Sequence, residues 1–503
     1  MLSIFATTEY HSQIHAILER EDRLSELVTI YDLLERAPRS SAHCLIVDAQ
    51  GLRLPIDWYN LAPPYLLPKQ LPFEAENLLG LIFLQLDNWP KVQEYLADRP
   101  ELLPELERFH GLKSGQQIRE VDRLEAGDTP WERYRRAHNQ AVLRHYGYLA
   151  EEQTFARIRQ AYDTAIAHSP HPEYAAFSTK HLATLLLDAG RIEDAVAVLQ
   201  GAEHEALSPD ARMALRALLS QVWMQQLRVP YDPKLMTQLK DTLWEVIQYL
   251  EENDRPVEAG LHLTDAAHIA NISNSFTESL GYISKAIRIF DEAELSELAG
   301  NAQLRKGTLL YTWAQNGNPQ FYKPAVEAYQ RALQVFRKDL TPDVFADIHH
   351  HLAVLYAEMP SEPKKRSIWA GVASASFQEA LDYYTAESHP YEYGRICNNY
   401  GNALTKFPPA VHSDNYEKAL FYYAEALRVR DARYPYERAI SLLNFLEASW
   451  NVSNPDESFN EDRYRDMVGK AEEVLQLVEA PEMMEAARGH LQALAQLKAV
   501  AVK

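Results

Sequence analysis

The chain has 503 residues, of which 47% are hydrophobic, so it is long enough and apolar enough to form a substantial core instead of a disordered chain. It carries 71 acidic against 50 basic residues, and this net charge of −21 repels phosphate groups. We therefore expect neither duplex nucleic acid nor an anionic membrane as a partner. Two cysteines are too few for a disulfide framework, and no secretory signal or apolar run of about 18 residues is apparent, which predicts a cytoplasmic protein.

Residues 1–125 are predicted to form a separate, mostly helical region. Apolar spacing indicates two amphipathic helices within residues 1–36. Two short apolar runs around a Gly-containing turn predict a β-hairpin, and we expect any strand to lie within about residues 43–57. Five prolines and three aromatic residues within residues 55–72 predict an ordered loop. Helices are expected again at residues 73–86, 90–96 and 102–109.

After a polar boundary at residues 111–128, the sequence repeats over residues 126–503. A residue suited to the first position of a helix, usually proline, recurs at intervals of 37 to 48 residues. The predicted helix starts are Pro130, Pro172, Pro209, Pro256, Ser296, Pro342, Pro390, Pro435 and Pro481. The last helix, with its Ala- and Leu-rich stretch 483–503, is predicted to cap the array.

A second column supports this register, because a small residue lies eleven positions after seven of the first eight starts. These residues are Ala141, Ala183, Ser220, Ala267, Gly307, Ala353 and Gly401, and only the copy at Pro435 departs, with Leu446. Small side chains allow two helices to approach closely, so we expect Gly307 and Gly401 to be packing residues. A single helical hairpin cannot bury its apolar face alone, so the pattern predicts a stack of hairpins.

In these features the chain resembles the tetratricopeptide repeat family, whose 34-residue helix–turn–helix unit has Gly or Ala at its eighth position. The copies at Pro390 and Pro435 are most similar to a long bacterial subtype with the pattern NNxGNA, here residues 398–403, that is found beside CHAT-type effectors. The resemblance implies an all-α, right-handed superhelical solenoid. Because these repeats exceed 34 residues, we expect enlarged turns at residues 360–373 and 407–415.

No motif predicts catalysis or a metal site. Three adjacent histidines, His349 to His351, point about 100° apart on a helix and cannot converge on one ion. Cys397 has no histidine within hydrogen-bond reach on its helix. No nucleophile elbow, phosphate loop or His-Glu-x-x-His motif occurs. We therefore expect no metal, no cofactor and no catalytic residues.

The strongest candidate site is a polar wall on the first helix of each hairpin. The resemblance implies that the concave face of the solenoid is built from fixed positions of this helix, and in this chain those positions carry amides, cations and histidines. Such side chains bind extended backbones and carboxylates. The candidates are Arg135, His138, Asn139, Lys180, His181, Asp265, Arg305, His350, His351, Arg395, Asn398, Asn399, Asn402 and Asn444.

Three functions are compatible with the sequence. The first is a non-enzymatic scaffold that binds a peptide segment or partner domain in the concave groove, with acidic groups or a carboxy terminus on the bound segment. The second is a peptide- or ligand-sensing regulatory subunit that controls a separate protease, nuclease or pore-former. The third, which no residue pattern favours, is an enzyme with an unfamiliar site in residues 1–125.

Overall fold

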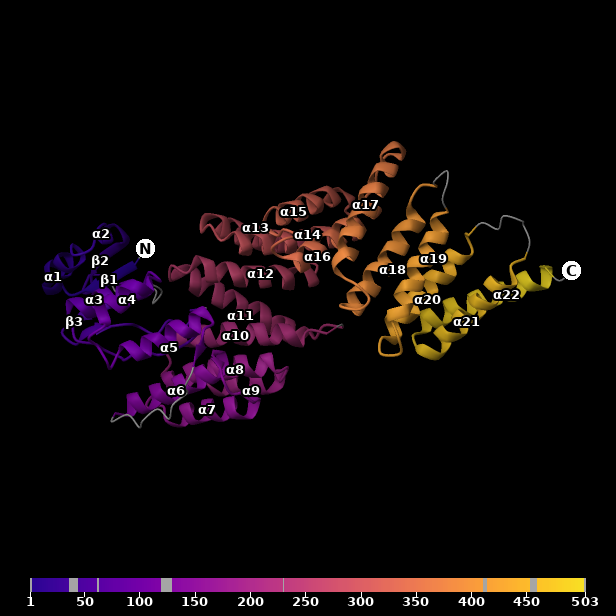
Figure 1. Cartoon of the computed structure of the whole chain (residues 1–503). Helices are drawn as coiled ribbons and strands as arrows, with labels where there is room; N and C mark the ends of the chain where they lie inside the picture. The colour runs from indigo at the N-terminus through magenta and orange to yellow at the C-terminus, as the bar shows by residue number, and fades with distance from the viewer. Residues whose placement is uncertain are drawn as a thin grey trace. The chain divides into compact units, whose positions relative to one another are not determined.

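The computed structural model describes residues 2–35, 44–60, 63–118, 129–228, 230–409, 414–452 and 459–501. It contains two compact units, Met1–Ile269 and Ala270–Lys503, which we call unit 1 and unit 2 (Figure 1). The predicted limit between residues 125 and 126 lies outside the described residues and stays a prediction.

Unit 1 begins with a four-stranded mixed sheet in the order β2-β1-β3-β4. The central strand β1 is parallel to both of its neighbours, and β3 and β4 form an antiparallel hairpin. The elements of this part are β1 (Leu2–Ala6), α1 (Thr8–Leu18), α2 (Leu24–Leu27), β2 (Val28–Asp32), β3 (Cys44–Asp48) and β4 (Gly51–Arg53). The predicted hairpin is confirmed. The prediction that residues 1–36 form two helices is wrong for β1 and β2. The prediction that strands are confined to about residues 43–57 is wrong for these two strands and for two short strands at residues 117–118 and 148–149.

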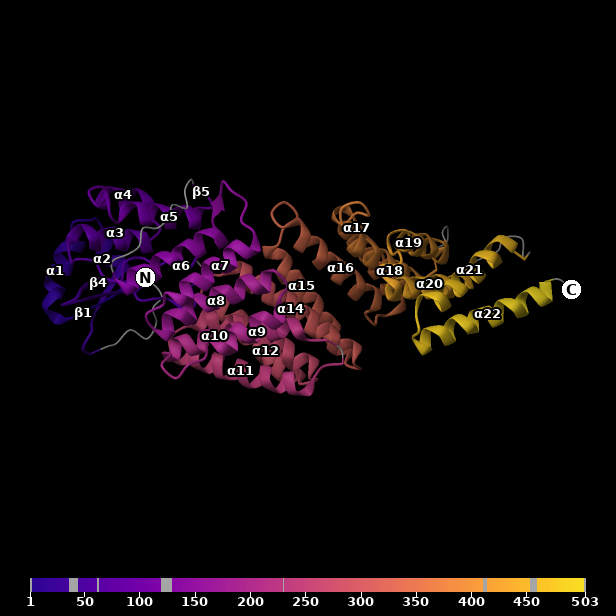
Figure 2. The ribbon, with the colours of Figure 1, turned by 90° about the horizontal axis from the view of Figure 1, so that it is seen from below.

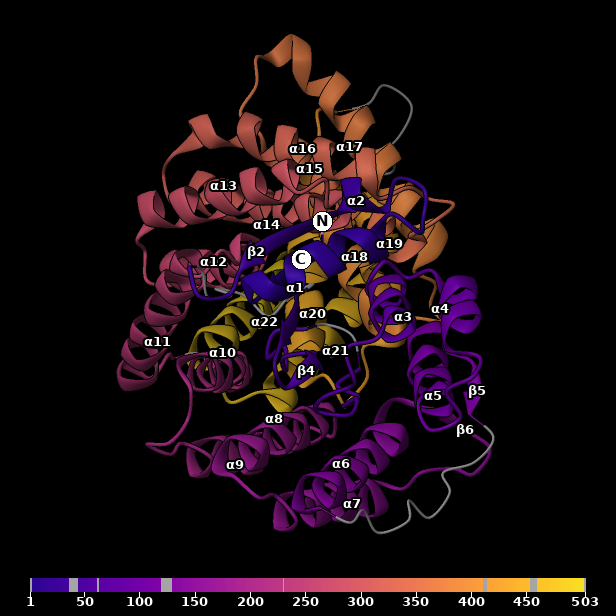
Figure 3. The same cartoon turned by 90° about the vertical axis from the view of Figure 1, so that its left-hand side faces the viewer.

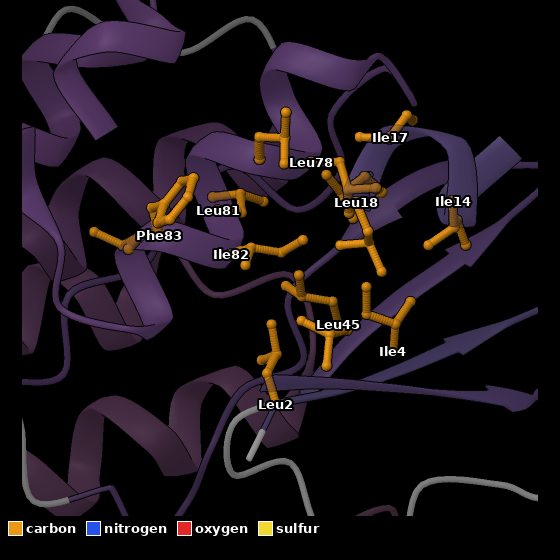
Figure 4. Packing of buried hydrophobic residues seen from close by; sticks show 14 of the residues in the cluster. Leu2, Ile4, Ile14, Ile17, Leu18, Leu45, Leu78, Leu81, Ile82 and Phe83 are labelled. Atoms are coloured by element: carbon orange, nitrogen blue, oxygen red, sulfur yellow. The ribbon is translucent and has the colours of Figure 1, made fainter. Parts of the chain in front are cut away.

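The sheet packs against helices through one apolar core. Ile4 of β1, Leu45 of β3, Leu18 of α1 and Ile82 of α3 are fully or almost fully buried in this core, and Figure 4 shows them close together. The covering helices are α3 (Ala75–Gln85), α4 (Trp89–Leu96) and α5 (Leu103–Ser114), as the sequence predicts. A short strand, β5 (Gln117–Ile118), pairs in parallel with β6 (Tyr148–Leu149).

The rest of unit 1 consists of helical hairpins that follow one another in an arc (Figure 3). The hairpins are α6 (Pro130–Tyr146) with α7 (Phe155–Ala167), α8 (Pro172–Asp188) with α9 (Ile192–Gly201), and α10 (Pro209–Gln226) with α11 (Pro233–Glu252). Helix α12 (Pro256–Ile272) follows, and the limit between the units falls near its end.

Unit 2 continues with the same kind of element, and Figure 2 shows the helices of its later hairpins lying side by side. Its helices are α13 (Phe276–Glu292), α14 (Ser296–Gln315), the short 3-10 helix η1 (Pro319–Phe321), α15 (Tyr322–Val335), α16 (Pro342–Glu358), α17 (Pro363–Tyr383), α18 (Pro390–Lys406), α19 (Asn415–Val429), α20 (Pro435–Ser449), α21 (Glu461–Leu477) and α22 (Pro481–Ala501).

All nine predicted helix starts are the first residues of helices, and the residues of the small column are buried. At Gly401 a β-carbon would lie 2.5 Å from the ring of Tyr423 in the partner helix of the hairpin, and at Gly307 it would lie 2.8 Å from the ring of Tyr329. At these two positions the small residue therefore gives room to a buried tyrosine. The predicted turn at residues 360–373 is wrong in its second part, because α17 begins at Pro363. The extra residues lengthen a helix there.

The fold is thus an all-α solenoid of stacked hairpins with a small sheet at its start. Among the described residues, no helix combines the length and the apolar character needed to cross a membrane. In the same part of the chain, no group of His, Cys, Asp and Glu side chains has an arrangement that could hold a metal ion.

Candidate functional site

In unit 1 the predicted polar wall contacts a stretch of the chain's own proline-rich loop. We call residues 57–60 and 63–67 of this loop the groove segment. The segment extends across successive first helices of the hairpins, from α12 and α10 near Asp57 and Tyr59 to α6 near Leu66. The wall thus holds a piece of polypeptide that is neither helix nor strand, with a turn at residues 58–59, and binding to a polypeptide backbone is what its residues predict.

Helix α6 holds the backbone of the groove segment at three points. The side-chain amide of Asn139 accepts a hydrogen bond from the Leu66 N–H at 2.8 Å and donates one to the Leu66 carbonyl at 2.7 Å. Arg135 also donates to this carbonyl, at 3.3 Å, and Nε2 of His138 lies 2.8 Å from the carbonyl oxygen of Pro64. All of these hydrogen bonds go to backbone N–H and carbonyl groups. They therefore do not depend on which side chains the segment carries.

The other helices bind the first part of the groove segment. The ammonium group of Lys180 on α8 donates to the carbonyl of Trp58, whose indole ring packs edge-on against Phe177 at 5.1 Å. Arg255, which precedes α12 and has a side chain only 1% exposed, forms an ion pair with Asp57 at 2.8 Å. Its guanidinium also lies over the ring of Tyr59, 4.7 Å from the ring centre.

Burial sets the protonation state of the titratable groups on this wall. Desolvation lowers the pKa of His138 from 6.5 to about 4, although its contact with the Pro64 carbonyl acts in the opposite direction. Desolvation also lowers the pKa of Lys180 from 10.5 to about 8, and the nearby Asp57 opposes this effect. At neutral pH His138 is therefore a neutral hydrogen-bonding residue, and Lys180 is mostly an ammonium ion.

The other two wall candidates of unit 1 are His181 and Asp265. His181 is buried among the rings of Phe177, Tyr146 and His138, and its Nε2 has no hydrogen-bond partner. Asp265 on α12 is half-buried.

In unit 2 the predicted wall residues mainly connect successive helices to one another. Asp347 of α16 pairs with Arg395 of α18 at 3.1 Å and with His351 at 3.5 Å. Burial opposes ionisation of Asp347, but these two partners outweigh it and lower the pKa of this carboxyl to about 2. The ring of His351 stacks on Tyr329 at 5.4 Å. The Nε of Arg395 is buried without a partner, although the side chain as a whole is 37% exposed.

The amides of this wall are largely engaged as well. Asn399 of α18 lies 3.0 Å from Nε2 of the buried His350, and Asn398 accepts bonds from Ser441 and Asn444 of α20 at 3.0 and 3.1 Å. Asn402 accepts from the Tyr423 hydroxyl at 2.7 Å, within its own hairpin. Arg305 on α14 is exposed. The candidates of α18 thus make polar contacts with α16 through Arg395 and Asn399, and with α20 through Asn398.

Sequence reasoning missed three residues that hold the groove segment. Arg255 lies outside the wall positions, Asp57 is part of the segment itself, and Glu105 of α5 accepts a bond from the Tyr65 hydroxyl and pairs with Arg135 at 3.4 Å. Only Arg255 has a local signal, because it immediately precedes a helix-starting proline. The partners of Asp57 and Tyr65 are far away in the sequence, and no pattern in a single sequence indicates them.

The geometry defines a helical-repeat solenoid of the tetratricopeptide type. The family model of soluble NSF attachment protein, SNAP, matches residues 234–390. No curated protein matches the chain. The proposed membership of the CHAT-associated bacterial subtype stays a prediction.

Three solved structures illustrate what this chain is similar to. A Pyrococcus horikoshii signal-transduction ATPase (STAND) protein with a tetratricopeptide repeat sensor has 16% identity and a TM-score of 0.48, over 84% of this chain and 65% of that one. BtubC from P. vanneervenii has 16% identity and a TM-score of 0.33, over 52% and 92%. Human IFIT1, as a dimer with m7Gppp-AAAA, has 14% identity and a TM-score of 0.38, over 84% and 90%. The exclusion of nucleic acid and the cytoplasmic location stay predictions.

Proposed function

We propose that this protein is a non-enzymatic interaction scaffold that binds an extended segment of a partner protein along the polar wall of unit 2. One observation carries the proposal: the same wall positions in unit 1 already hold a polypeptide backbone. Asn139 forms two hydrogen bonds with Leu66, and His138 and Arg135 bond the adjoining carbonyls. The wall positions of unit 1 therefore form the kind of hydrogen bonds with a polypeptide backbone that we expect of them.

The partner segment is proposed to bind to unit 2 because the wall of unit 1 is already engaged with the groove segment. In unit 2 the exposed Arg305 and the partly exposed Arg395 supply positive charge, and Nε of Arg395 is a buried donor without a partner. An arginine with a donor that has no partner and with part of its guanidinium surface accessible suits a carboxylate. The proposed partner segment thus carries acidic side chains or a free carboxy terminus.

Two substitutions test this function. Replacing Arg305 and Arg395 with Gln keeps the side chains polar and removes both charges, while Asn399 stays in place because it contacts the buried His350. The matched control replaces Arg288 and Arg465 with Gln; both are largely exposed and lie on second helices of hairpins. We expect the wall variant to lose about 1–3 kcal/mol of partner affinity per charged hydrogen bond.

The measurement is quantitative co-purification of the native partner with the wild-type chain and both variants, at matched melting temperatures. Loss of the partner from the wall variant alone supports the proposal. Equal recovery from both variants contradicts it and places the partner elsewhere on the chain.

The regulatory alternative remains a second proposal, in which a small ligand or peptide alters the solenoid and thereby a separate effector. A cavity in unit 1 favours it.

A further inference from the structure

Unit 1 contains a cavity of about 500 Å³ between its sheet, the groove segment and the hairpin helices. Its wall includes residues of β3 and β4, of the proline-rich loop, and of the N-terminal halves of α6, α8 and α10. Binding sites for small organic molecules typically occupy about 300–1,000 Å³. The cavity therefore has the size of a small-molecule site, and the groove segment forms part of its wall.

The carboxylates that line the cavity already have partners. Glu173 accepts bonds from the hydroxyl and the N–H of Ser208 at 2.7 and 3.2 Å, and Asp210 accepts from the Tyr249 hydroxyl at 2.9 Å. Asp57 pairs with Arg255 at 2.8 Å. The three carboxylates of the wall are thus committed to contacts within the protein, which disfavours a cationic ligand.

Several donors on the same wall are not committed. The indole N–H of Trp131 and the Nε–H of Arg53 are buried and have no hydrogen-bond partner. Lys180 carries three N–H donors as an ammonium ion and gives one of them to the carbonyl of Trp58. His181, only 8% exposed, also has an Nε2 without a partner, and this atom donates or accepts according to the tautomer of the neutral ring. Buried donors without partners favour a ligand that brings acceptor atoms.

The remaining wall is rich in flat apolar surface. Trp131 packs against Tyr174 at 4.7 Å, and Trp58 packs against Phe177 at 5.1 Å; Tyr65 and Phe109 add two more rings to the lining. Aromatic surfaces of this kind stack favourably on flat ligands. Burial raises the pKa of the Cys44 thiol to about 12, so this lining residue stays protonated and is not a nucleophile.

We infer that this cavity is a binding site for a small organic anion, in which a flat apolar body lies among the aromatic rings and a carboxylate bonds to Lys180 or the Trp131 indole N–H. The bound molecule would contact both the groove segment and the helices that hold it, and would therefore stabilise their association. The inference concerns unit 1 alone and does not depend on partner binding to unit 2.

The experiment uses the full chain labelled with 5-fluorotryptophan, because Trp131 and Trp58 line the cavity and report on it by ¹⁹F NMR. The chain has eight tryptophans, and Trp131→Phe identifies the resonance of Trp131. The probe is 3-phenylpropanoate, and the matched control is 3-phenylpropylamine, which has the same ring and chain with the opposite charge. We expect saturable movement of the Trp131 resonance with the carboxylate and none with the amine.

Two variants show which donors carry the binding. Lys180→Met should weaken binding of 3-phenylpropanoate at least tenfold, whereas Lys240→Met, on the exposed face of α11, should leave it unchanged. Trp131→Phe keeps an aromatic ring, although a smaller one, and removes the donor, so the rise in melting temperature caused by the carboxylate should shrink. This measurement decides the question if Lys180→Met does not fold. An equal response to the amine, no response to the carboxylate, or unchanged binding in both variants would overturn the inference. None of these outcomes affects the co-purification test of unit 2.

Discussion

The polar walls of the two units carry similar residues at equivalent repeat positions but use them differently. Arg135, His138 and Asn139 of α6 correspond in the repeat to Arg395, Asn398 and Asn399 of α18. The α6 residues bond the backbone of the groove segment. The α18 residues bond side chains of the neighbouring helices α16 and α20.

This difference shows that a polar column on a solenoid does not by itself identify a ligand site. The same amide can hold an extended chain or link two helices, because both offer acceptors and donors at hydrogen-bond distance. Which of the two contacts an amide makes depends on whether another segment of the chain covers the wall. Unit 1 has the groove segment in this place, so its polar groups are buried more deeply than Arg395 or His351 of unit 2.

The largest expected effect comes from the ion pair between Arg255 and Asp57. Arg255→Met leaves the Asp57 carboxylate buried without its cation, which we expect to destabilise unit 1 by about 3–5 kcal/mol. The matched change in unit 2, Arg395→Met, breaks a more exposed pair with Asp347 and should cost about 1 kcal/mol or less. Urea unfolding of both variants measures the two values. Similar losses in the free energy of unfolding would contradict the conclusion that the ion pair of unit 1 is buried more deeply than that of unit 2.

The second largest effect is expected from acid, which should weaken the contact between His138 and the groove segment. His138 has a folded-state pKa of about 4 against 6.5 for the free side chain, so the unfolded chain binds its proton first as the pH falls. The stability that this residue contributes is present above pH 6.5 and is lost progressively towards pH 4. Between pH 7 and pH 5 the loss amounts to about 2 kcal/mol. Unfolding of wild type and His138→Asn at both pH values tests this, and an equal acid sensitivity of the two proteins would contradict it.

Packing within the hairpins should give an effect that does not depend on the walls. Gly401→Leu places a side chain against the ring of Tyr423, and overpacking of this kind costs about 1–3 kcal/mol. Gly469→Leu in α21 meets nothing within 4 Å and serves as the control with the same gain in helix propensity. Thermal melts compare the two. An unchanged melting temperature for Gly401→Leu would show that the small column does not set the hairpin spacing.

Much of the solenoid could be predicted because its signals are local. A proline fits the first turn of a helix through its own geometry, and a glycine opposite a tyrosine recurs with the repeat, so Pro390 and Gly401 occupy the predicted places. The strands β1 and β2 could not be recognised in this way. Each has only five residues, and a short apolar run does not distinguish a strand from a helix by its periodicity.

The sequence predicts which residues form the polar wall and that they bind a polypeptide backbone. It does not predict which segment they bind. The wall positions of Asn139 and His138 follow from the repeat, and their side chains indicate binding to an extended backbone. That this backbone is Pro64 and Leu66 depends on contacts across more than 70 positions, for which a single sequence carries no signal. The link between Asn398 and Ser441 in unit 2 likewise depends on the spacing of adjacent hairpins.

The ion pair between Asp57 and Arg255 also has a consequence for biosynthesis. The two residues are 198 positions apart, so a ribosome that adds about 5–20 residues per second makes Arg255 about 10–40 seconds after Asp57. Until then Asp57 and Tyr59 lack the guanidinium of Arg255. Leu66 and Trp58 can find their partners on α6 and α8 earlier, so the groove segment is held stepwise from its end towards its start, and Asp57 is paired last.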